Sequence, residues 1–540
     1  MKKSVSYDVL VIIALLAVPL LMVTQLPNSN NPYMNGMTPW IVTFMSVFVI
    51  WTVKLNQKLK QQLLDVLVLT YLLYWHLRFL TLAVFPQYDL VLTRTVSISA
   101  NDFNNYAWVV VGVFSSAVAG FYAAHRYIGY HTAAHGKLSR FNWDRIDRVV
   151  DISEKFLPIS IYFISMMMFH FVVTTFFGLG EKPVWVGYLS LFFDPGIGTF
   201  LMLFLFFSPG LKGKRKAVVI GFFIALVMVM VAAGSRSILV NLIFSAFIVM
   251  FVFRRKPSFA LKSFLLIIVA IVFISLTFAY ATFQRDLRST GLGFGVMSVG
   301  YSSCKVMEVS AGSPINVCQD LYQSIFNSIE EGTEESAEES AEEGAEEGAE
   351  EAGARAAAEA GARAEIQALK STVSGLFGYA FARAGYLDFS AEFYMNDNFD
   401  AALNFKNYGK SIIDNSVPGS FFDDSKRIEH RIRDVYNPSA IGYQSDALGV
   451  VGENYRLFGY LYPVAIFSVA FAFCCFFSMC GPTIVGVYAK YVIAVGLVAW
   501  VNSYGYDTLI LDMSRELLIG AFVVSLVFFN WNKLTTYVHR

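Results

Sequence analysis

The chain has 540 residues, of which 56% are hydrophobic, 16% aromatic and 15% charged, and its formal net charge at pH 7 is zero. This composition is too apolar and too poor in charge for an ordinary soluble protein of that length. The apolar segments run to roughly 20 residues, which suits membrane-spanning α-helices, whereas barrel strands need only about ten alternating residues. We therefore expect an all-α polytopic membrane protein.

In chain order, apolar runs bounded by charged residues, Pro or Gly predict about 12 transmembrane helices. The first run is too long for a signal peptide and lacks a small-residue cleavage site, so we expect it to stay in the membrane. The predicted helices cover residues 7–24, 39–54, 63–85, 106–123, 156–178, 186–208, 216–233, 236–253, 262–282, 457–478, 484–502 and 505–530.

The placement of Lys and Arg predicts the orientation of these helices. One set of alternate connections is rich in basic residues, whereas the other short connections carry almost none, and basic loops stay in the cytoplasm. Both termini are therefore expected in the cytoplasm. The basic connections hold Lys2 and Lys3, Lys54 to Lys60, Arg126 to Arg148, Lys212 to Lys216 and Arg254 to Lys262.

The predicted organisation has three parts: helices one to nine in residues 1–282, a large periplasmic loop at 283–456, and helices ten to twelve in 457–540. Within the loop, residues 329–365 are low-complexity, and residues 330–351 hold twelve Glu and no basic residue. Like charges at every fourth position repel along a helix. We therefore expect this segment to be a disordered acidic spacer.

Two of the five cysteines, Cys304 and Cys318, lie in this loop, where a disulfide is chemically permitted. The sequence leaves open whether they are bridged. The other three lie in a predicted membrane helix and are expected to behave as small apolar groups: Cys474, Cys475 and Cys480.

The loop also contains a predicted amphipathic helix at 424–436, which ends before Pro438. Its apolar stripe should consist of Ile428, Ile432 and Val435, which are spaced by four and three residues. The opposite face would be cationic, because it carries Arg427, His430, Arg431 and Asp434.

Arginines near the outer membrane surface are candidates for binding a diphosphate. Arg236 lies in the tight connection Gly-Ser-Arg-Ser at 234–237, among hydroxyls and backbone amides, and a guanidinium grips phosphate through forked hydrogen bonds. The alternative is an interfacial Arg that reaches lipid headgroups. The further candidates are Arg285, Arg288, Arg383, Arg427, Arg431 and Arg456.

His430 is the expected proton acceptor for a sugar hydroxyl, because two neighbouring arginines would hold it neutral. A solvated surface histidine is the alternative, and Asp388, Glu392 and Glu453 are rival bases. The sequence has no metal-ligand spacing and no Walker loop, so we expect neither a bound metal nor nucleotide-driven work.

Ionisable residues inside predicted spans are also candidates for function, since burying them alone costs several kcal/mol. His76 and Arg78 lie in the third predicted helix, and Asp194-Pro195-Gly196 interrupts the sixth. Structural pairing is an equally open alternative. The same two interpretations apply to His170, Asp507, Asp512, Arg515 and Glu516.

Three short motifs carry a resemblance to a known family. They are Gly-Ser-Arg-Ser at 234–237, Arg-Ala-Gly-Tyr-Leu-Asp at 383–388, and Gly-Glu-Asn-Tyr-Arg-Leu-Phe-Gly-Tyr-Leu at 452–461. With the predicted topology of nearly the whole chain, they resemble the bacterial O-antigen or oligosaccharide-repeat-unit polymerases of the Wzy type. The acidic repeat at 330–351 matches nothing in the family pattern.

The resemblance implies a metal-independent glycosyltransferase of GT-C-like architecture in the bacterial inner membrane, related to the O-antigen ligases. Such an enzyme joins oligosaccharide repeat units, carried on undecaprenyl diphosphate, into O-antigen, capsule or exopolysaccharide on the periplasmic face. It needs no cofactor. Membrane lipids, a chain-length regulator (co-polymerase) and a flippase are its expected partners, and nucleic acid is not.

By this resemblance, Arg236 matches the family's Gly-Ser-Arg turn, Arg383 its Arg-x-Gly element, and Glu453 and Arg456 its polar stretch before the post-loop helix. We expect three groups of site residues: His430 and Glu453 as catalytic residues; Arg236, Arg285, Arg288, Arg383, Arg427 and Arg431 for diphosphate binding; and His76, Arg78, Asp388 and Arg456 for substrate binding.

Two other functions remain open. An O-antigen ligase uses the same donor but transfers the glycan to the lipid A core. A polysaccharide flippase or secondary transporter usually shows internal repeats, and one very large loop between two helices breaks such symmetry, which argues against transport.

Overall fold

A computed structural model describes the chain in separate ranges, and the structural statements below concern these ranges. They are residues 4–24, 31, 33–84, 99–135, 160–166, 168–169, 195–207, 213–232, 244–251, 258–260, 304, 391, 394–395, 403–416, 428, 431–432, 449–481, 483–502 and 505–527.

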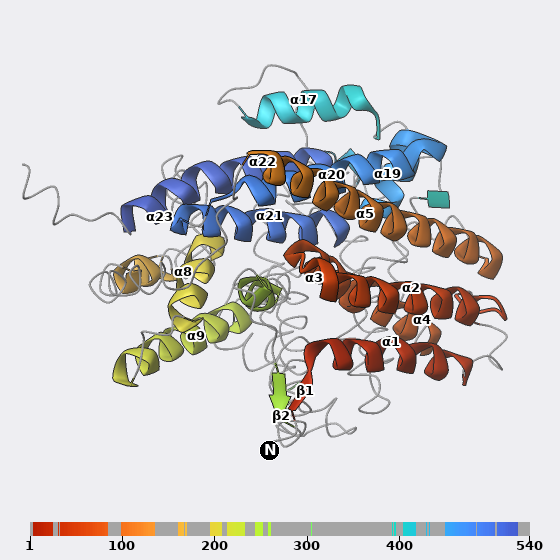
Figure 1. Ribbon diagram of the computed structural model, residues 1–540, viewed down its shortest axis with the longest axis horizontal. Coiled ribbons are helices and arrows are strands. Elements are labelled where there is room, and N and C mark those ends of the chain that lie inside the picture. The colour runs from red at the N-terminus through yellow and green to blue at the C-terminus, as the bar shows by residue number, and fades with distance from the viewer. Residues whose placement is uncertain are drawn as a thin grey trace, which may run out of the picture.

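A first group of helices comes from the N-terminal part of the chain. The helix α1 packs against α2 and α4, and α3, η1 and α4 follow one another without a break, η1 being a π-helical segment (Figure 1). The bounds are α1 (Tyr7–Val23), α2 (Thr38–Leu59), α3 (Gln62–Thr70), η1 (Tyr71–His76) and α4 (Leu77–Val84).

Side chains fix both ends of α2. At its start, Asn35 Oδ1 accepts hydrogen bonds from the backbone N–H groups of Met37 and Thr38, at 2.8 and 3.3 Å. At its end, Lys60 adopts a left-handed φ of 55°. The side chain of Asn56 accepts a hydrogen bond of 2.8 Å from the backbone N–H of Gln61 and donates one of 2.9 Å to the backbone oxygen of the same residue. These bonds satisfy backbone groups that helix ends leave open, and the second set makes the tight turn into α3.

A second group lies beside the first in Figure 1 and combines one N-terminal helix with the C-terminal part of the chain. The helix α5 runs along α20, which contacts α21, and α21 contacts α3 of the first group. The bounds are α5 (Ala100–His135), α19 (Val450–Phe458), the 3₁₀ turn η5 (Gly459–Leu461), α20 (Tyr462–Met479), α21 (Ile484–Asn502), α22 (Tyr506–Arg515), the π-helical η6 (Glu516–Gly520) and α23 (Ala521–Val527).

Glycine lets α5 and α20 approach closely. A Cβ atom added at Gly120 would lie 2.5 Å from the backbone oxygen of Phe467 and 3.1 Å from Cβ of Ala470. A Cβ atom at Gly112 would lie 2.1 Å from the hydroxyl of Tyr462. Small residues at such crossings allow backbones to pack tightly where lipid offers no hydrophobic drive.

Three further helices belong to the described fold: α8 (Pro195–Phe207) packs against α9 (Gly213–Ala232), and α17 (Phe405–Ser416) packs against α22 (Figure 1). Residues 160–166, 168–169 and 244–251 are also helical. Strand β1 (Ser4–Ser6) pairs antiparallel with β2 (Ser258–Ala260). The described fold is otherwise helical, as expected for an all-α protein, and this pair of three-residue strands is a small exception that the sequence did not predict.

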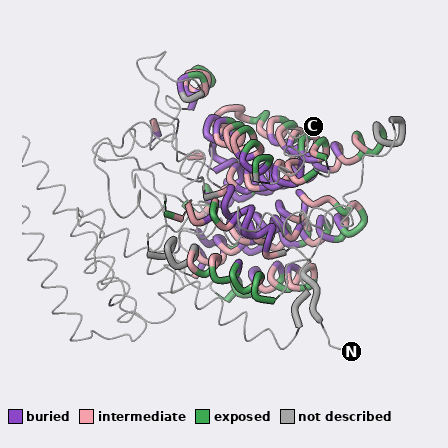
Figure 2. Tube along the Cα trace, turned by 90° about the vertical axis from the view of Figure 1, so that its left-hand side faces the viewer, coloured by how far each residue is buried: buried purple, intermediate pink, exposed green. Residues whose placement is uncertain are grey.

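Buried residues gather where the helices face one another, and exposed residues lie on their outer faces (Figure 2). Five described helical stretches are long and apolar enough to cross a membrane, which makes this a membrane protein. They are Thr38–Leu59, Gln62–Val84, Ala100–Tyr130, Val450–Met479 and Ile484–Asn502, and the shorter apolar helices are Asp8–Val23 and Gly196–Phe206.

The described helices overlap the predicted spans, but α5 at Ala100–His135 extends well beyond the predicted 106–123 at both ends. Helical structure before the tenth span begins at Val450, and Gly459, with a φ of 53°, separates α19 from the span proper. The described part of the sixth predicted span, α8, begins at Pro195, and residues 186–194 lie outside the described residues, so the interruption at Asp194-Pro195-Gly196 stays a prediction. The predicted span at 262–282 and the acidic spacer lie outside the described residues.

Cys304 is disulfide-bonded, whereas Cys474, Cys475 and Cys480 are free thiols. Cys318, the partner that the sequence offered, lies outside the described residues.

Candidate functional site

The site that the structure offers is an acidic junction, by which we mean the buried carboxylates of Glu453 and Asp507 with the hydroxyls of Tyr408 and Ser411 that bond to them. Glu453 belongs to α19 and Asp507 to α22, while both hydroxyls belong to α17 in the large loop. Glu453, Asp507 and Ser411 are fully buried, and Tyr408 is 5% exposed.

Glu453 lies in the first turn of α19, which begins after Gly449 with a φ of 65°. Its Oε1 accepts a hydrogen bond from the Tyr408 hydroxyl and another, 2.9 Å long, from the backbone N–H of Tyr506. One carboxylate oxygen therefore joins α17, α19 and α22.

Asp507 makes a similar connection from the first turn of α22. Its Oδ2 accepts a hydrogen bond of 2.6 Å from the Ser411 hydroxyl and one of 3.2 Å from the backbone N–H of Ile428. Its Oδ1 is buried and accepts no hydrogen bond. Asp507 thus holds α17 and Ile428, which are separate in sequence.

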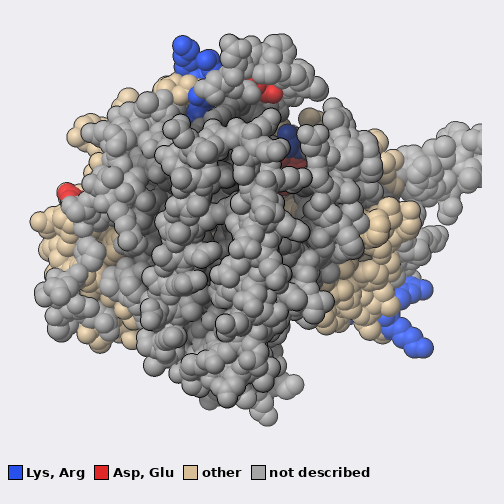
Figure 3. Space-filling view, turned by 180° about the vertical axis from the view of Figure 1, so that it is seen from behind, with Lys and Arg blue, Asp and Glu red and all other residues tan. Residues whose placement is uncertain are grey.

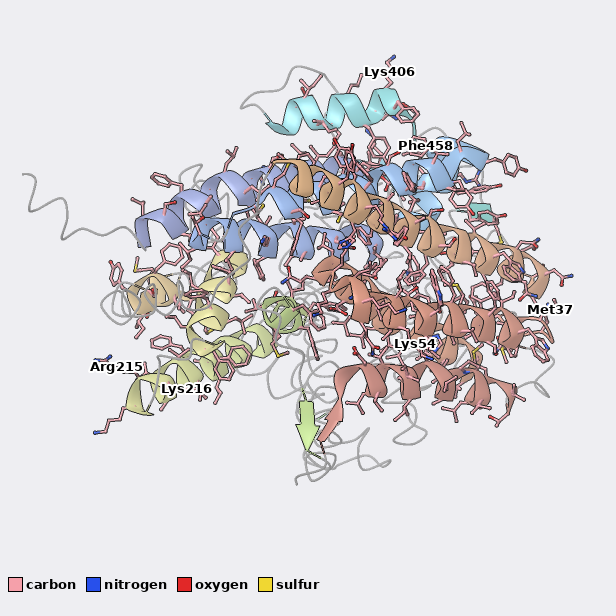
Figure 4. All side chains as sticks on the ribbon, in the orientation of Figure 1. Met37, Lys54, Arg215, Lys216, Lys406 and Phe458 are labelled. Atoms are coloured by element: carbon pink, nitrogen blue, oxygen red, sulfur yellow. The ribbon has the colours of Figure 1, made fainter. Side chains whose placement is uncertain are left out.

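The hydroxyls reach these acids because of where they stand on α17. The backbone N–H of Asn407 donates to Asn404 Oδ1 at 2.9 Å, which caps the start of the helix. Tyr408 and Ser411 then follow three residues apart, a spacing that puts both on one helix face. In Figure 4, Lys406 points away from the helices from the start of α17, and Phe458 lies below it on α19.

Electrostatics favour the hydrogen-bonded state of Tyr408. Burial, and then the negative charge of Glu453, raise the pKa of Tyr408 well above its ordinary value, and Asp507 adds to the effect. The hydroxyl therefore keeps its proton at neutral pH and remains a donor to Glu453.

Further contacts extend the acidic junction. The Tyr506 hydroxyl donates to Asn454 Oδ1 at 2.6 Å, which ties α22 to α19 a second time. Arg456 Nη2 donates to the backbone oxygen of Tyr394 at 2.8 Å, and the ring of Tyr394 lies 4.5 Å from that of Tyr455. Another segment of the loop is thereby held against α19.

Three of the expected site residues lie at or beside the acidic junction: Glu453, Arg456 and Arg431. Ile428, Arg431 and Ile432 are helical, Arg431 is half-buried, and both isoleucines are fully buried. These positions confirm the predicted apolar stripe for its two described members. Glu453 has no exposed surface, so in this conformation it could not receive a proton from a sugar hydroxyl.

The structure places His76 and Arg78 elsewhere, inside the N-terminal group of helices. Both are buried, at 0 and 1% exposure. His76 ends the π-helical segment η1, and its Nδ1 lies 3.3 Å from the Tyr71 hydroxyl, while Arg78 Nη1 donates to Thr81 Oγ1 at 3.4 Å. Their burial favours the structural alternative in this conformation, although π-helical segments often mark functional sites.

The remaining expected site residues lie outside the described residues. They are Arg236, Arg285, Arg288, Arg383, Asp388, Arg427 and His430. His170, Glu392 and Asp194 also lie there.

Sequence reasoning missed Tyr408, Ser411 and Asn454 and named Asp507 only as one of several ionisable residues. A weak signal was present, because Asn404 is a good helix-capping residue before a segment with Tyr408 and Ser411 at helical spacing. No local pattern, however, could connect α17 to acids 45 and 96 positions away.

In Figure 3 basic side chains of the described residues show at the top of the molecule, in a small recessed area of its upper half, and at the lower right edge. Figure 4 identifies the last of these with Arg215 and Lys216, at the start of α9. Among the described His, Cys, Asp and Glu residues, no group of three or more is arranged to hold a metal ion.

The fold and the acidic junction together define a helical membrane protein in which α17 and Ile428 are docked on the starts of α19 and α22. No protein-family model, curated protein or solved structure matches the chain.

Proposed function

We propose that this protein is a membrane glycosyltransferase that polymerises undecaprenyl-diphosphate-linked oligosaccharide repeat units into a surface polysaccharide. The polysaccharide would be an O-antigen, a capsule or an exopolysaccharide. In this proposal about 12 helices span the bacterial inner membrane, both termini are cytoplasmic, and the loop at 283–456 faces the periplasm.

The observation that carries the proposal is the docking of the loop. The helix α17 and the residues around Ile428 are fixed to the starts of α19 and α22 through buried carboxylates, and Arg431 and Arg456 lie beside them. Guanidinium groups near the membrane surface are suited to a lipid diphosphate, and a docked loop can hold a glycan over it. The sequence motifs around Arg236 and Arg383 add to this support.

The proposed reaction needs positioning and one proton acceptor. An acceptor-sugar hydroxyl attacks the anomeric carbon of the donor glycan, the bond from that carbon to the phosphate oxygen breaks, and its electrons leave with the diphosphate. Arginines such as Arg236, Arg285 and Arg288 would stabilise the developing charge. The hydroxyl proton passes to a base, for which His430 is the first candidate because Glu453 is covered by α17.

Gene deletion with complementation tests the proposal. Deletion should leave surface glycans with a single repeat unit, wild type should restore long chains, and Arg236→Ala should not. Arg215→Ala, at the start of α9, serves as the matched control and should restore long chains. Unattached long glycan in the deletion strain would instead identify a ligase, and full-length polymer from an expressed Arg236→Ala variant would reject the diphosphate assignment.

A further inference from the structure

The carboxylate of Asp507 bonds two separate parts of the large loop at once. Its Oδ2 accepts from Ser411 Oγ at 2.6 Å and from the backbone N–H of Ile428 at 3.2 Å. We propose that Asp507 is a positioning residue, which holds α17 and the helical residues around Arg431 on α22 and so fixes the place of Arg431. This inference rests on the proposed function.

The hydrogen bonds of Asp507 are buried, which strengthens them. Asp507, Ser411, Ile428 and Ile432 all have no exposed surface. Hydrogen bonds strengthen where water is excluded. Asp507 belongs to the first turn of α22, which continues through η6 into α23, so its own backbone is well supported.

The effect on Arg431 follows from its distance along the chain. Arg431 stands three residues after Ile428, about one helical turn, and both residues are helical. Losing the bond to the Ile428 amide would free the start of this turn and let the guanidinium shift. A misplacement of about 1 Å can lower a rate by about 10²-fold.

Two substitutions of Asp507 distinguish the effect of its hydrogen bonds from the effect of its side-chain volume. In Asp507→Asn the amide oxygen still accepts hydrogen bonds from Ser411 and Ile428, whereas Asp507→Ala accepts none. Thr508→Val is the matched control, because Thr508 is the next residue, is 2% exposed and its hydroxyl has no hydrogen-bond partner. This control keeps the shape of the side chain and leaves the loop contacts intact.

The experiment compares full-length wild type and these variants in lipid nanodiscs, with two measurements. Hydrogen–deuterium exchange follows the peptide containing Ile428, and chain-extension kinetics use undecaprenyl-diphosphate-linked repeats. In Asp507→Ala we expect exchange at least about 10-fold faster and kcat about 10- to 100-fold lower, with the donor KM within about threefold. Asp507→Asn should fall between wild type and Asp507→Ala in both measurements, and Thr508→Val should match wild type.

The two measurements test different claims and can contradict each of them independently. Unchanged exchange in Asp507→Ala overturns the anchor, whatever the kinetics show. Faster exchange with full kcat overturns the role of Asp507 in positioning Arg431 for the reaction. A folded wild-type protein that extends no chains refutes the proposed function, while the exchange data still decide the anchor.

If Asp507→Ala does not fold, Ser411→Ala and Asp507→Asn replace it. Ser411→Ala should speed exchange in α17 and leave the Ile428 peptide nearly unchanged, because it removes only one of the two bonds. Asp507→Asn should speed exchange in both segments, less than about tenfold. No change in either variant overturns the anchor.

Discussion

Tyr408 illustrates how one hydroxyl connects α17 to α19. It donates to Glu453, it is almost fully buried, and its raised pKa keeps the proton in place at neutral pH. A buried hydrogen bond to a carboxylate contributes about 1.5 to 3 kcal/mol to stability. The contact therefore matters to the free energy of unfolding as well as to the shape of the site.

We predict that Tyr408→Phe lowers the free energy of unfolding by about 1 to 3 kcal/mol, because it removes a donor to a buried carboxylate. Thermal unfolding of the purified protein in detergent measures this. Tyr460→Phe is the control, since Tyr460 is 90% exposed and should lose its hydroxyl at no cost. Equal melting temperatures for the Tyr408 and Tyr460 variants would contradict the prediction.

At this scale the sequence predicted residue types better than partners. The family resemblance predicted Glu453, the concentration of arginines predicted Arg431, and helical periodicity predicted the buried stripe of Ile428 and Ile432. It did not predict that Glu453 would be covered by α17, since that contact joins residues 45 positions apart. Side-chain hydrogen bonds over such separations leave no local pattern to detect.

At the scale of elements, the packing of α5 against α20 depends on Gly120, which lies against the backbone of α20. At Gly120 a methyl group would meet the backbone oxygen of Phe467 at 2.5 Å, which cannot move aside as a side chain can. Gly129 lies on the same helix and would meet nothing within 4 Å. The two positions form a matched pair.

Gly120→Ala should destabilise the protein by about 1 to 3 kcal/mol through overpacking. Gly129→Ala should be neutral or stabilise by up to about 1 kcal/mol, because Ala favours the helix over Gly. Melting temperatures of the two variants in one detergent make the comparison. A Gly120→Ala protein as stable as the Gly129→Ala protein would show that α5 and α20 do not pack this closely.

The elements that the sequence predicted best are the long apolar helices, since bilayer thickness sets their length. Hydrophobicity did not reveal the break at Gly459, because α19 and α20 form one helical, mostly apolar stretch from Val450. The π-helical segments and the pairing of β1 with β2 were also missed. Such features depend on packing and on distant partners rather than on local composition.

At the scale of the whole molecule, the proposed orientation puts α17 outside the cell membrane and the start of α9 inside. Lys406 on α17 and Lys214 on α9 are both exposed, and each is suited to replacement by Cys. The free thiols at Cys474, Cys475 and Cys480 would first be changed to Ala, so that labelling reports the introduced residue.

We predict that a membrane-impermeant maleimide labels Lys406→Cys in intact spheroplasts and labels Lys214→Cys only after the membrane is permeabilised. The positive-inside distribution of charge is the physical reason. The reverse pattern would invert the topology and would remove the loop from the periplasmic face.

The central claim is that this protein itself lengthens lipid-linked glycans. The most direct measurement is to reconstitute the purified chain in liposomes with undecaprenyl-diphosphate-linked repeat units, and to follow glycan length by gel electrophoresis. We predict a ladder of longer glycans that requires the protein and neither metal nor nucleotide. Folded protein that leaves every glycan at one repeat unit, or only moves it across the bilayer, would contradict the claim.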